Sequence, residues 1–256
     1  MCGRYAITLP PEAMRTFFRY VEHPNFPPRY NIAPTEPTPI VRAERHSDGR
    51  ITRHFMLVRW GFLPHFVKEP KEFPLIFNAR SETLLTKVSF KAAFRRRRCL
   101  FIADAFYEWR RDPTAKGKAG RPYLFRRCDG APLGLAGLWE TWTGPNGEEQ
   151  DTACIITTAA NGASAAIHDR LPATLEPDAL DLWLDPDETS ADSAFKLLRP
   201  PENDVLEFFE ISPAVNKVGN DSAEVQAPIA RAPAGDGVQP TTPEPTTYSN
   251  RQGSLF

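Results

Sequence analysis

The chain of 256 residues lacks CxxC cysteine pairs, a large net charge and any apolar run approaching about 18 residues. Its cysteines, Cys2, Cys99, Cys128 and Cys154, stand apart, which argues against a zinc knuckle and fits a reducing compartment. Without a secretory signal or a transmembrane run, we expect a soluble cytoplasmic protein with no membrane partner. The net charge of -1 does not by itself indicate a nucleic-acid partner. No metal or cofactor is expected, and without a heptad pattern we expect a monomer.

What is present is a series of short apolar segments separated by polar turns, with few helical patterns. This arrangement predicts an α+β domain with a mainly antiparallel sheet over residues 1–222. Residues 99–107 are strongly apolar and predict one buried strand, and residues 82–95 predict a helix. Residues 223–250 are rich in Pro, Thr, Ala and Gly, with little to bury, and predict a disordered linker.

A cysteine directly follows the initiator methionine. If Met1 is removed, Cys2 carries a free α-amine and a thiol on adjacent carbons, and such a pair can close on an aldehyde to give a thiazolidine ring. The ordinary pKa values, about 8 for the amine and about 8.5 for the thiol, leave usable fractions of both nucleophiles near neutral pH. The alternative is that Cys2 stands there by accident of position.

Three further polar residues stand where the pattern alone would place structural ones. Asn78 and Glu108 each follow an apolar segment, and His168 opens a loop. A carboxyl group beside apolar residues has a raised pKa and suits general acid–base catalysis, and a histidine suits proton delivery. Each also has a structural alternative: Asn78 as a helix cap, Glu108 as a surface partner of Arg80 or Arg110, and His168 as a hydrogen-bonded loop residue.

Basic and aromatic side chains accompany these positions. Arg4, Arg80 and Arg170 each lie within two residues of one of the four, and arginine forks suit phosphate oxygens. Phe66 and Trp109 could stack on unpaired bases, with core packing as the alternative. The run of basic residues 95–98 is explained equally well as a solvated face.

Seven short segments carry a resemblance to a known family. They are residues 1–5 (MCGRY), 29–34 (RYNIAP), 59–61 (RWG), 78–83 (NARSET), 106–109 (FYEW), 157–161 (TTAAN) and 167–172 (IHDRLP). In this order they closely resemble the SOS response-associated peptidase family of abasic-site-processing proteins, over roughly residues 2–222. The resemblance implies a single domain with a barrel-like β core flanked by short helices.

The resemblance also implies a function, the covalent capture of abasic sites in single-stranded DNA. Cys2 would be the nucleophile that forms the thiazolidine, and Asn78 would position its amine or the sugar hydroxyl. Glu108 would transfer protons and His168 would act on the sugar hydroxyl, with associated lyase and reversal chemistry. The residues expected to contact DNA are Arg4, Asn31, Pro34, Phe66, Arg80, Trp109 and Arg170.

Three positions depart from the family pattern, one of them, Leu171 in place of methionine or arginine, as a neutral change. Phe66 follows Pro64 and His65 where bacterial members carry a tryptophan-rich segment, and Thr35 stands where glycine is frequent. A second hypothesis is a cysteine peptidase that acts on protein substrates through Cys2, His168 and Asn78. A third is a single-strand-binding module without catalysis.

The last residues, 251–256, resemble the clamp-binding peptide of bacterial replication and repair proteins. Gln252, Leu255 and Phe256 match it, and Gly253 replaces a leucine. A flexible tether that ends in two apolar anchors suits a small hydrophobic pocket on a partner, here the replication sliding clamp. This interpretation predicts association with the nucleoid.

Overall fold

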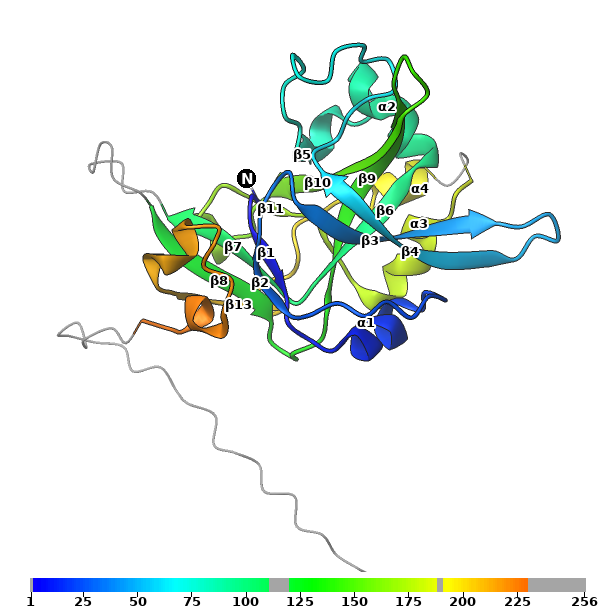
Figure 1. Cartoon of the computed structure of the whole chain (residues 1–256). Helices are drawn as coiled ribbons and strands as arrows, with labels where there is room; N and C mark the ends of the chain where they lie inside the picture. Colours follow the sequence, from blue (N-terminus) through cyan, green and yellow to red (C-terminus); the bar gives the residue numbers. More distant parts are fainter. Residues whose placement is uncertain (1, 111–119, 188–190, 230–256) are drawn as a thin grey trace, which may run out of the picture.

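Five long strands close on one another into a barrel at the centre of the molecule (Figure 1). The computed structural model describes residues 2–110, 120–187 and 191–229. Around the barrel the order is β10 (Glu149–Ala159), β4 (Ile51–Trp60), β3 (Pro37–Arg45), β6 (Arg98–Ala103) and β9 (Leu133–Thr143), which pairs again with β10. All these pairings are antiparallel except β4 with β10. Closure leaves the barrel itself without an open edge, and this confirms the predicted α+β class with a barrel-like core.

Short strands extend the barrel at β10 and β9. β5 (Asn78–Arg80) pairs parallel to β10, β11 (Arg170–Pro172) pairs antiparallel to β10, and β12 (Thr174–Leu175) pairs with β9. β5 and β11 therefore both lie against the second half of β10. This brings the chain around Asn78 and the chain around Arg170 to the same strand, although they are far apart in sequence.

A second sheet of five antiparallel strands lies beside the barrel. Its order is β13 (Leu206–Glu210), β8 (Arg121–Arg127), β7 (Ala105–Arg110), β1 (Tyr5–Ile7) and β2 (Arg29–Ile32). Tyr5 of β1 reaches into the barrel, where its ring lies edge-on to Trp60 at 5.3 Å and to Phe101 at 6.2 Å between centroids. Its hydroxyl also hydrogen-bonds to the Thr38 hydroxyl. The N-terminal strand is thus anchored between the two sheets.

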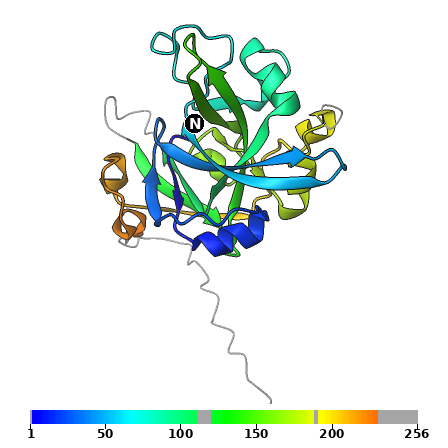
Figure 2. The ribbon, with the colours of Figure 1, turned by 45° about the vertical axis from the view of Figure 1, so that its right-hand side comes forward.

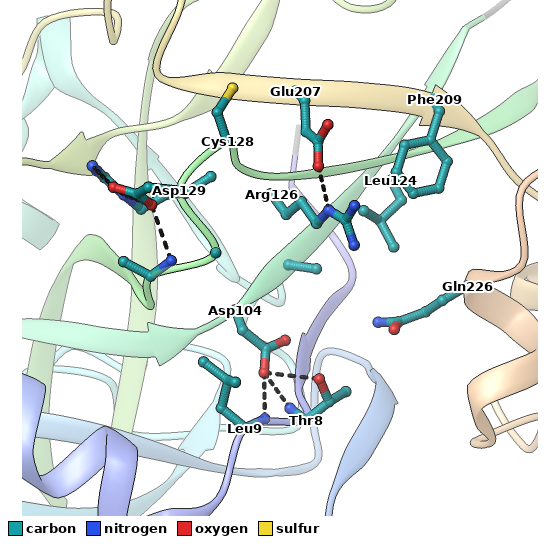
Figure 3. Close-up of a pocket in the computed structure, with 14 residues that line it drawn as sticks. Thr8, Leu9, Asp104, Leu124, Arg126, Cys128, Asp129, Glu207, Phe209 and Gln226 are labelled. Carbon is teal, nitrogen blue, oxygen red and sulfur yellow. Dashed lines mark hydrogen bonds and ion pairs between the residues drawn. The ribbon is translucent and has the colours of Figure 1, made fainter. Parts of the chain in front are cut away.

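The single strand predicted for residues 99–107 is wrong, because the chain changes sheets at Asp104. β6 ends at Ala103 and β7 begins at Ala105. The Asp104 carboxylate accepts hydrogen bonds from the Leu9 amide at 2.7 Å, the Thr8 hydroxyl at 3.0 Å and the Thr8 amide (Figure 3). These bonds fix the bend, and an apolar pattern does not reveal them because both strands are buried.

Short helices flank the two sheets, with α1 below the barrel and α2 above it in Figures 1 and 2. The α-helices are α1 (Pro11–Phe18), α2 (Val88–Arg96), α3 (Leu180–Leu184) and α4 (Ala191–Phe195). The 3-10 helices are η1 (Ser81–Thr83), η2 (Ser164–Ala166), η3 (Pro177–Ala179), η5 (Pro213–Asn216) and η6 (Ala223–Gln226). None of the described helices has the length and apolar character that crossing a membrane requires.

The helix predicted for residues 82–95 is divided into η1 and α2. Thr83 and Thr86 direct their hydroxyls to backbone oxygens three residues earlier, at 3.1 and 3.3 Å, which competes with a continuous helix. Lys87 then adopts extended backbone angles before α2 begins at Val88. Periodicity alone could not place this break.

The packed chain continues past residue 222, where the sequence analysis placed the end of the domain. Val225 in η6 is 1% exposed and belongs to an apolar cluster with Tyr107 and Leu124. Ile211 forms a bridge with Pro228, and the Ile229 amide donates to the Glu210 oxygen at 3.0 Å. The linker predicted for residues 223–250 therefore begins with residues that belong to the fold, and the rest of it lies outside the described residues.

Candidate active site

Cys2 lies just before β1 and is fully buried. Its thiol points to the backbone oxygen of Arg4, at 3.7 Å from sulfur to oxygen. Burial raises the pKa of the thiol well above its ordinary value, and the nearby charge of Glu108 raises it further. The thiol is therefore held in its neutral form, and a reaction at sulfur requires a group that can accept its proton.

Asn78 holds the backbone of Cys2. It stands on β5, opposite Ile155 of β10, and its side-chain amide donates to the Cys2 oxygen at 2.8 Å and to the Phe77 oxygen at 2.7 Å. Its Oδ1 is buried and accepts no hydrogen bond from the described residues. The helix-cap alternative is wrong, because Arg80 and Lys87 are the N-caps of η1 and α2.

Glu108 is a buried carboxyl group on β7, in the second sheet beside β1. It is 1% exposed, so the alternative of a surface partner for Arg80 or Arg110 is wrong. Burial raises the pKa of Glu108 to about 7. A carboxyl group with this pKa exchanges its proton readily at neutral pH, which is the property that general acid–base catalysis needs.

His168 lies on the loop between η2 and β11 and directs its imidazole at Glu108. Nε2 lies 3.9 Å from the Glu108 Oε2, and Nδ1 lies 3.0 Å from the amide nitrogen of Arg170. Nδ1 is also 3.0 Å from the Asp169 carboxylate. Nδ1 also lies 3.0 Å from the Arg170 oxygen, so the position of the ring proton depends on the tautomer. In the tautomer whose Nδ1 accepts from the Arg170 amide, Nε2 carries a proton toward Glu108, and the two groups then form an acid–base pair.

The loop that carries His168 is fixed by Asn161, a residue that the sequence analysis quoted only as part of a motif. Asn161 Oδ1 accepts from the Ser164 amide at 2.9 Å, and Nδ2 donates to the Pro201 oxygen at 3.0 Å. The Ser164 oxygen in turn accepts from the His168 amide at 3.2 Å. Its position in the TTAAN segment was the available signal for this role.

A groove of about 610 Å³ opens beside His168. Its lining residues are Phe77, Arg80, Trp109 and residues 165–170. Arg80 is exposed, and within the described ranges its guanidinium forms neither an ion pair nor a hydrogen bond. Trp109 is half-buried and donates from its indole nitrogen to Asn216 Oδ1 at 2.7 Å. The groove thus offers a cation and an aromatic face close to the acid–base pair.

The other two arginines are engaged within the protein. Arg170 forms a two-pronged ion pair with Glu82, at 3.0 Å for each contact, and its guanidinium also donates to the Thr157 oxygen at 2.6 Å. Arg4 donates to the Val215 oxygen at 2.6 Å and to Asn31 Oδ1 at 2.8 Å. These contacts hold Arg4 and Arg170 within the protein, and Arg170 also lines the groove, so the expected contact of both with phosphates stays a prediction.

Asn31, another expected DNA contact, is fully buried, and its side-chain amide donates to the backbone oxygens of Val215, Lys217 and Asn220 at 2.9 to 3.1 Å. Its side chain has no exposed surface in this structure, so a contact with DNA stays a prediction that requires the side chain to become accessible. Asn31 ties β2 to the segment after η5.

The remaining expected DNA contacts lie at the surface outside the lining of the groove. Pro34 is half-buried in the turn between β2 and β3, and Phe66 is 45% exposed on the loop after β4. Thr35, the position where glycine is frequent in the family, has a φ of 79°, a left-handed conformation that a β-branched residue seldom adopts. The backbone there keeps the glycine-like shape despite the substitution.

Comparison with known proteins gives a consistent result. A family model described as SOS response associated peptidase (SRAP) matches residues 1–218. The abasic site processing protein YoqW of Bacillus subtilis (strain 168) is 34% identical over 229 residues, covering 88% of this chain and 98% of the relative. The abasic site processing protein HMCES of Xenopus tropicalis is 31% identical over 269 residues, covering 90% of this chain and 78% of the relative.

Solved structures agree with the fold. A protein from Bordetella bronchiseptica superposes with a TM-score of 0.68 at 28% identity, covering 82% of this chain and all of that one. A protein from Bacteroides thetaiotaomicron superposes with a TM-score of 0.72 at 22% identity, covering 88% of this chain and 98% of that one. The second likeness concerns the fold alone.

Proposed function

Because the chain belongs to the SOS response-associated peptidase family, we propose that it processes abasic sites in DNA by covalent capture through Cys2. Relatives that align with most of this chain are named abasic site processing proteins, which supports the substrate class. The observation that carries the chemistry is the convergence on Cys2 of two side chains. Asn78 donates to its backbone oxygen, and the charge of Glu108, which faces His168, acts on its thiol.

The proposed reaction starts with the removal of Met1. Hydrolysis of the first peptide bond releases the α-amine of Cys2, which attacks the aldehyde carbon of the ring-opened abasic sugar. Loss of water gives a Schiff base. The thiol then adds across the carbon–nitrogen double bond, forming a carbon–sulfur bond, and its proton ends on the ring nitrogen. The product is a thiazolidine, and no electrons are gained or lost overall.

The surrounding residues match these proton transfers. Glu108, with a pKa of about 7, takes the thiol proton, which burial otherwise holds in place, and passes it on. His168 donates from Nε2 to the sugar ring oxygen, which leaves the anomeric carbon and becomes a hydroxyl as the ring opens. The Asn78 Oδ1, with no donor among the described residues, accepts a hydrogen bond from the new amine.

The groove supplies the binding site for the strand. Arg80 pairs with a phosphate beside the lesion, because its exposed guanidinium is available for a two-pronged contact. Trp109 stacks on a neighbouring unpaired base. The stacking by Trp109 favours single-stranded DNA, since a base within a duplex is already stacked.

The test is an incubation of the protein, with Met1 removed, with a single-stranded oligonucleotide that contains one abasic site. We expect a heat-stable adduct on a denaturing gel. A matched oligonucleotide with a tetrahydrofuran residue, which lacks the aldehyde, serves as control and should give none. If the aldehyde oligonucleotide forms no adduct, or the tetrahydrofuran oligonucleotide forms one equally well, the proposed chemistry is wrong.

The cysteine-peptidase hypothesis has less support from the geometry. In such an arrangement Asn78 would orient the imidazole of His168. Here Asn78 donates to the Cys2 and Phe77 oxygens, while His168 is oriented by the backbone of Arg170. The site is arranged around the backbone of Cys2 rather than around a thiol–imidazole pair.

We also propose that the C-terminal peptide recruits the replication sliding clamp. Gln252, Leu255 and Phe256 lie outside the described residues, so this proposal rests on their sequence. Deletion of residues 252–256 should abolish pull-down by the clamp and leave the formation of the DNA adduct unchanged. Unchanged pull-down would contradict the proposal.

A further inference from the structure

Helix α2 presents to solvent a face without acidic side chains. Its sequence, VSFKAAFRR, contains Lys and Arg but no Asp or Glu. Phe90, Ala93 and Phe94 form its buried side, which leaves Lys91 and Arg95 exposed one turn apart. Like charges at this spacing destabilise a helix. Neither side chain has an ion pair in the described part of the chain, so the repulsion is uncompensated there.

A groove of about 450 Å³ runs along this face. Its lining combines apolar Val88 and Ala92 with the basic side chains of Lys91 and residues 95–97, together with His65 from the loop after β4. Val88 is 77% exposed. The groove shares no lining residue with the groove beside His168. It is therefore a separate surface beside α2, the helix on the upper side of the molecule in Figures 1 and 2.

We propose that this groove binds an acidic peptide segment that carries an aliphatic or aromatic side chain. The carboxylates would pair with Lys91 and Arg95, and the apolar side chain would cover Val88 and Ala92. Of the cations in the lining, Arg97 already has a carboxylate partner in the chain, Glu140 at 2.8 Å. Helix α2 is about 13 Å long at 1.5 Å per residue, which matches about four residues of an extended peptide at 3.3 Å each. The chain as a whole has a net charge of -1, so attraction of an acidic partner depends on this local cluster.

The lining favours a peptide over a nucleic acid. Single-stranded DNA is held by aromatic faces on which the bases stack, and the groove has aliphatic side chains with His65 as its one ring among the lining residues. An exposed valine beside cations is suited instead to an apolar side chain flanked by carboxylates. This inference is independent of the proposed reaction at Cys2.

The test uses the full chain and a fluorescein-labelled peptide of three aspartates followed by leucine and phenylalanine. Fluorescence anisotropy should show binding that weakens as salt is raised. Lys91→Glu should weaken it about tenfold or more, because the charge reversal repels the aspartates. Val88→Ser should weaken it several-fold without changing the melting temperature, since Val88 lies largely in solvent.

Lys196→Glu is the matched control, because Lys196 is exposed and lies outside the groove lining. It should change binding less than about twofold. A peptide with asparagines in place of the aspartates, and one with serines in place of the apolar pair, should both bind poorly.

Failure of the wild-type chain to bind the acidic peptide would overturn the proposal. It would also be overturned by equal effects of both charge reversals, or by binding of labelled oligothymidine at this groove in preference to the peptide. Formation of the abasic adduct by Lys91→Glu, measured in parallel, reports on the Cys2 chemistry separately.

Discussion

Replacement of Cys2 by alanine is expected to abolish the heat-stable adduct with abasic single-stranded DNA. The alanine variant keeps an α-amine once Met1 is removed, so it can still form a Schiff base, but it has no sulfur to close the ring. A Schiff base hydrolyses on heating, so the yield of heat-stable adduct should fall by a factor on the order of 100 or more. Quantitative denaturing electrophoresis after heating measures this directly.

Cys2→Ser separates the role of the amine from that of the thiol. We expect this variant to give an adduct only when borohydride reduces the Schiff base, and none that survives heat untrapped. The matched control is Cys128→Ala, which removes the one exposed cysteine of the described chain and should leave the yield unchanged. A stable, untrapped adduct with Cys2→Ser would show that the ring does not form through sulfur.

Met1 is expected to control the same reaction. While the first peptide bond is intact, the nitrogen of Cys2 is an amide and cannot attack an aldehyde. The Asn78 amide already holds the Cys2 oxygen, and Glu108 is already buried nearby. The side chains are therefore arranged before the amine exists, which is why a change at the first peptide bond is enough to switch on the proposed capture.

The residues of the site could be identified from the sequence because they lie in short motifs at the ends of apolar segments. Glu108 follows directly after the buried Phe106 and Tyr107, Asn78 follows the half-buried Phe77, and His168 opens the loop before β11. The pairings that unite them, β5 with β10 and β1 with β7, join segments more than 70 residues apart. No local pattern encodes such pairings, so the convergence was predictable only through the family resemblance.

The internal partners of the arginines could not be predicted from the sequence. Arg4, Arg80 and Arg170 look equivalent as neighbours of site residues. Arg170 is paired with Glu82 and Arg4 with the backbone of Val215, which lies 211 positions away. Whether a guanidinium faces a phosphate or an internal acceptor depends on these distant partners. For the same reason the change of sheet at Asp104 was missed, because the amides that its carboxylate binds belong to Thr8 and Leu9.

Glu108→Gln is expected to alter both stability and rate, and the pH dependence of stability identifies the cause. The pKa of Glu108 is about 7 in the folded chain, against an ordinary value of 4.5, so the fold prefers the protonated form. Its contribution to stability is complete below pH 4.5 and is lost as the pH rises toward 7. At 1.36 kcal/mol per pH unit, the loss amounts to about 3 kcal/mol.

Glutamine stays neutral and should show no such loss. The difference in unfolding free energy between the wild type and Glu108→Gln, both with the same N-terminus, should therefore shift by about 3 kcal/mol in favour of the variant between pH 4.5 and 8. Urea unfolding across this range measures it, and Glu207→Gln, at an exposed carboxylate, is the control that should show a difference within about 1 kcal/mol.

The rate of adduct formation should move in the opposite direction from stability. Because glutamine cannot accept the thiol proton, cross-linking by Glu108→Gln should slow by about 100-fold or more. The pH dependence of the variant's rate should also lack the inflection that we expect of the wild type where Glu108, with its raised pKa, titrates. A variant that is more stable at pH 8 yet slower to cross-link would show that the ionisation of buried Glu108 lowers stability and that the same carboxyl group transfers the proton. If instead the variant kept the wild-type rate, proton transfer would have to be assigned to another group such as His168, whose Nε2 lies 3.9 Å from the Glu108 Oε2.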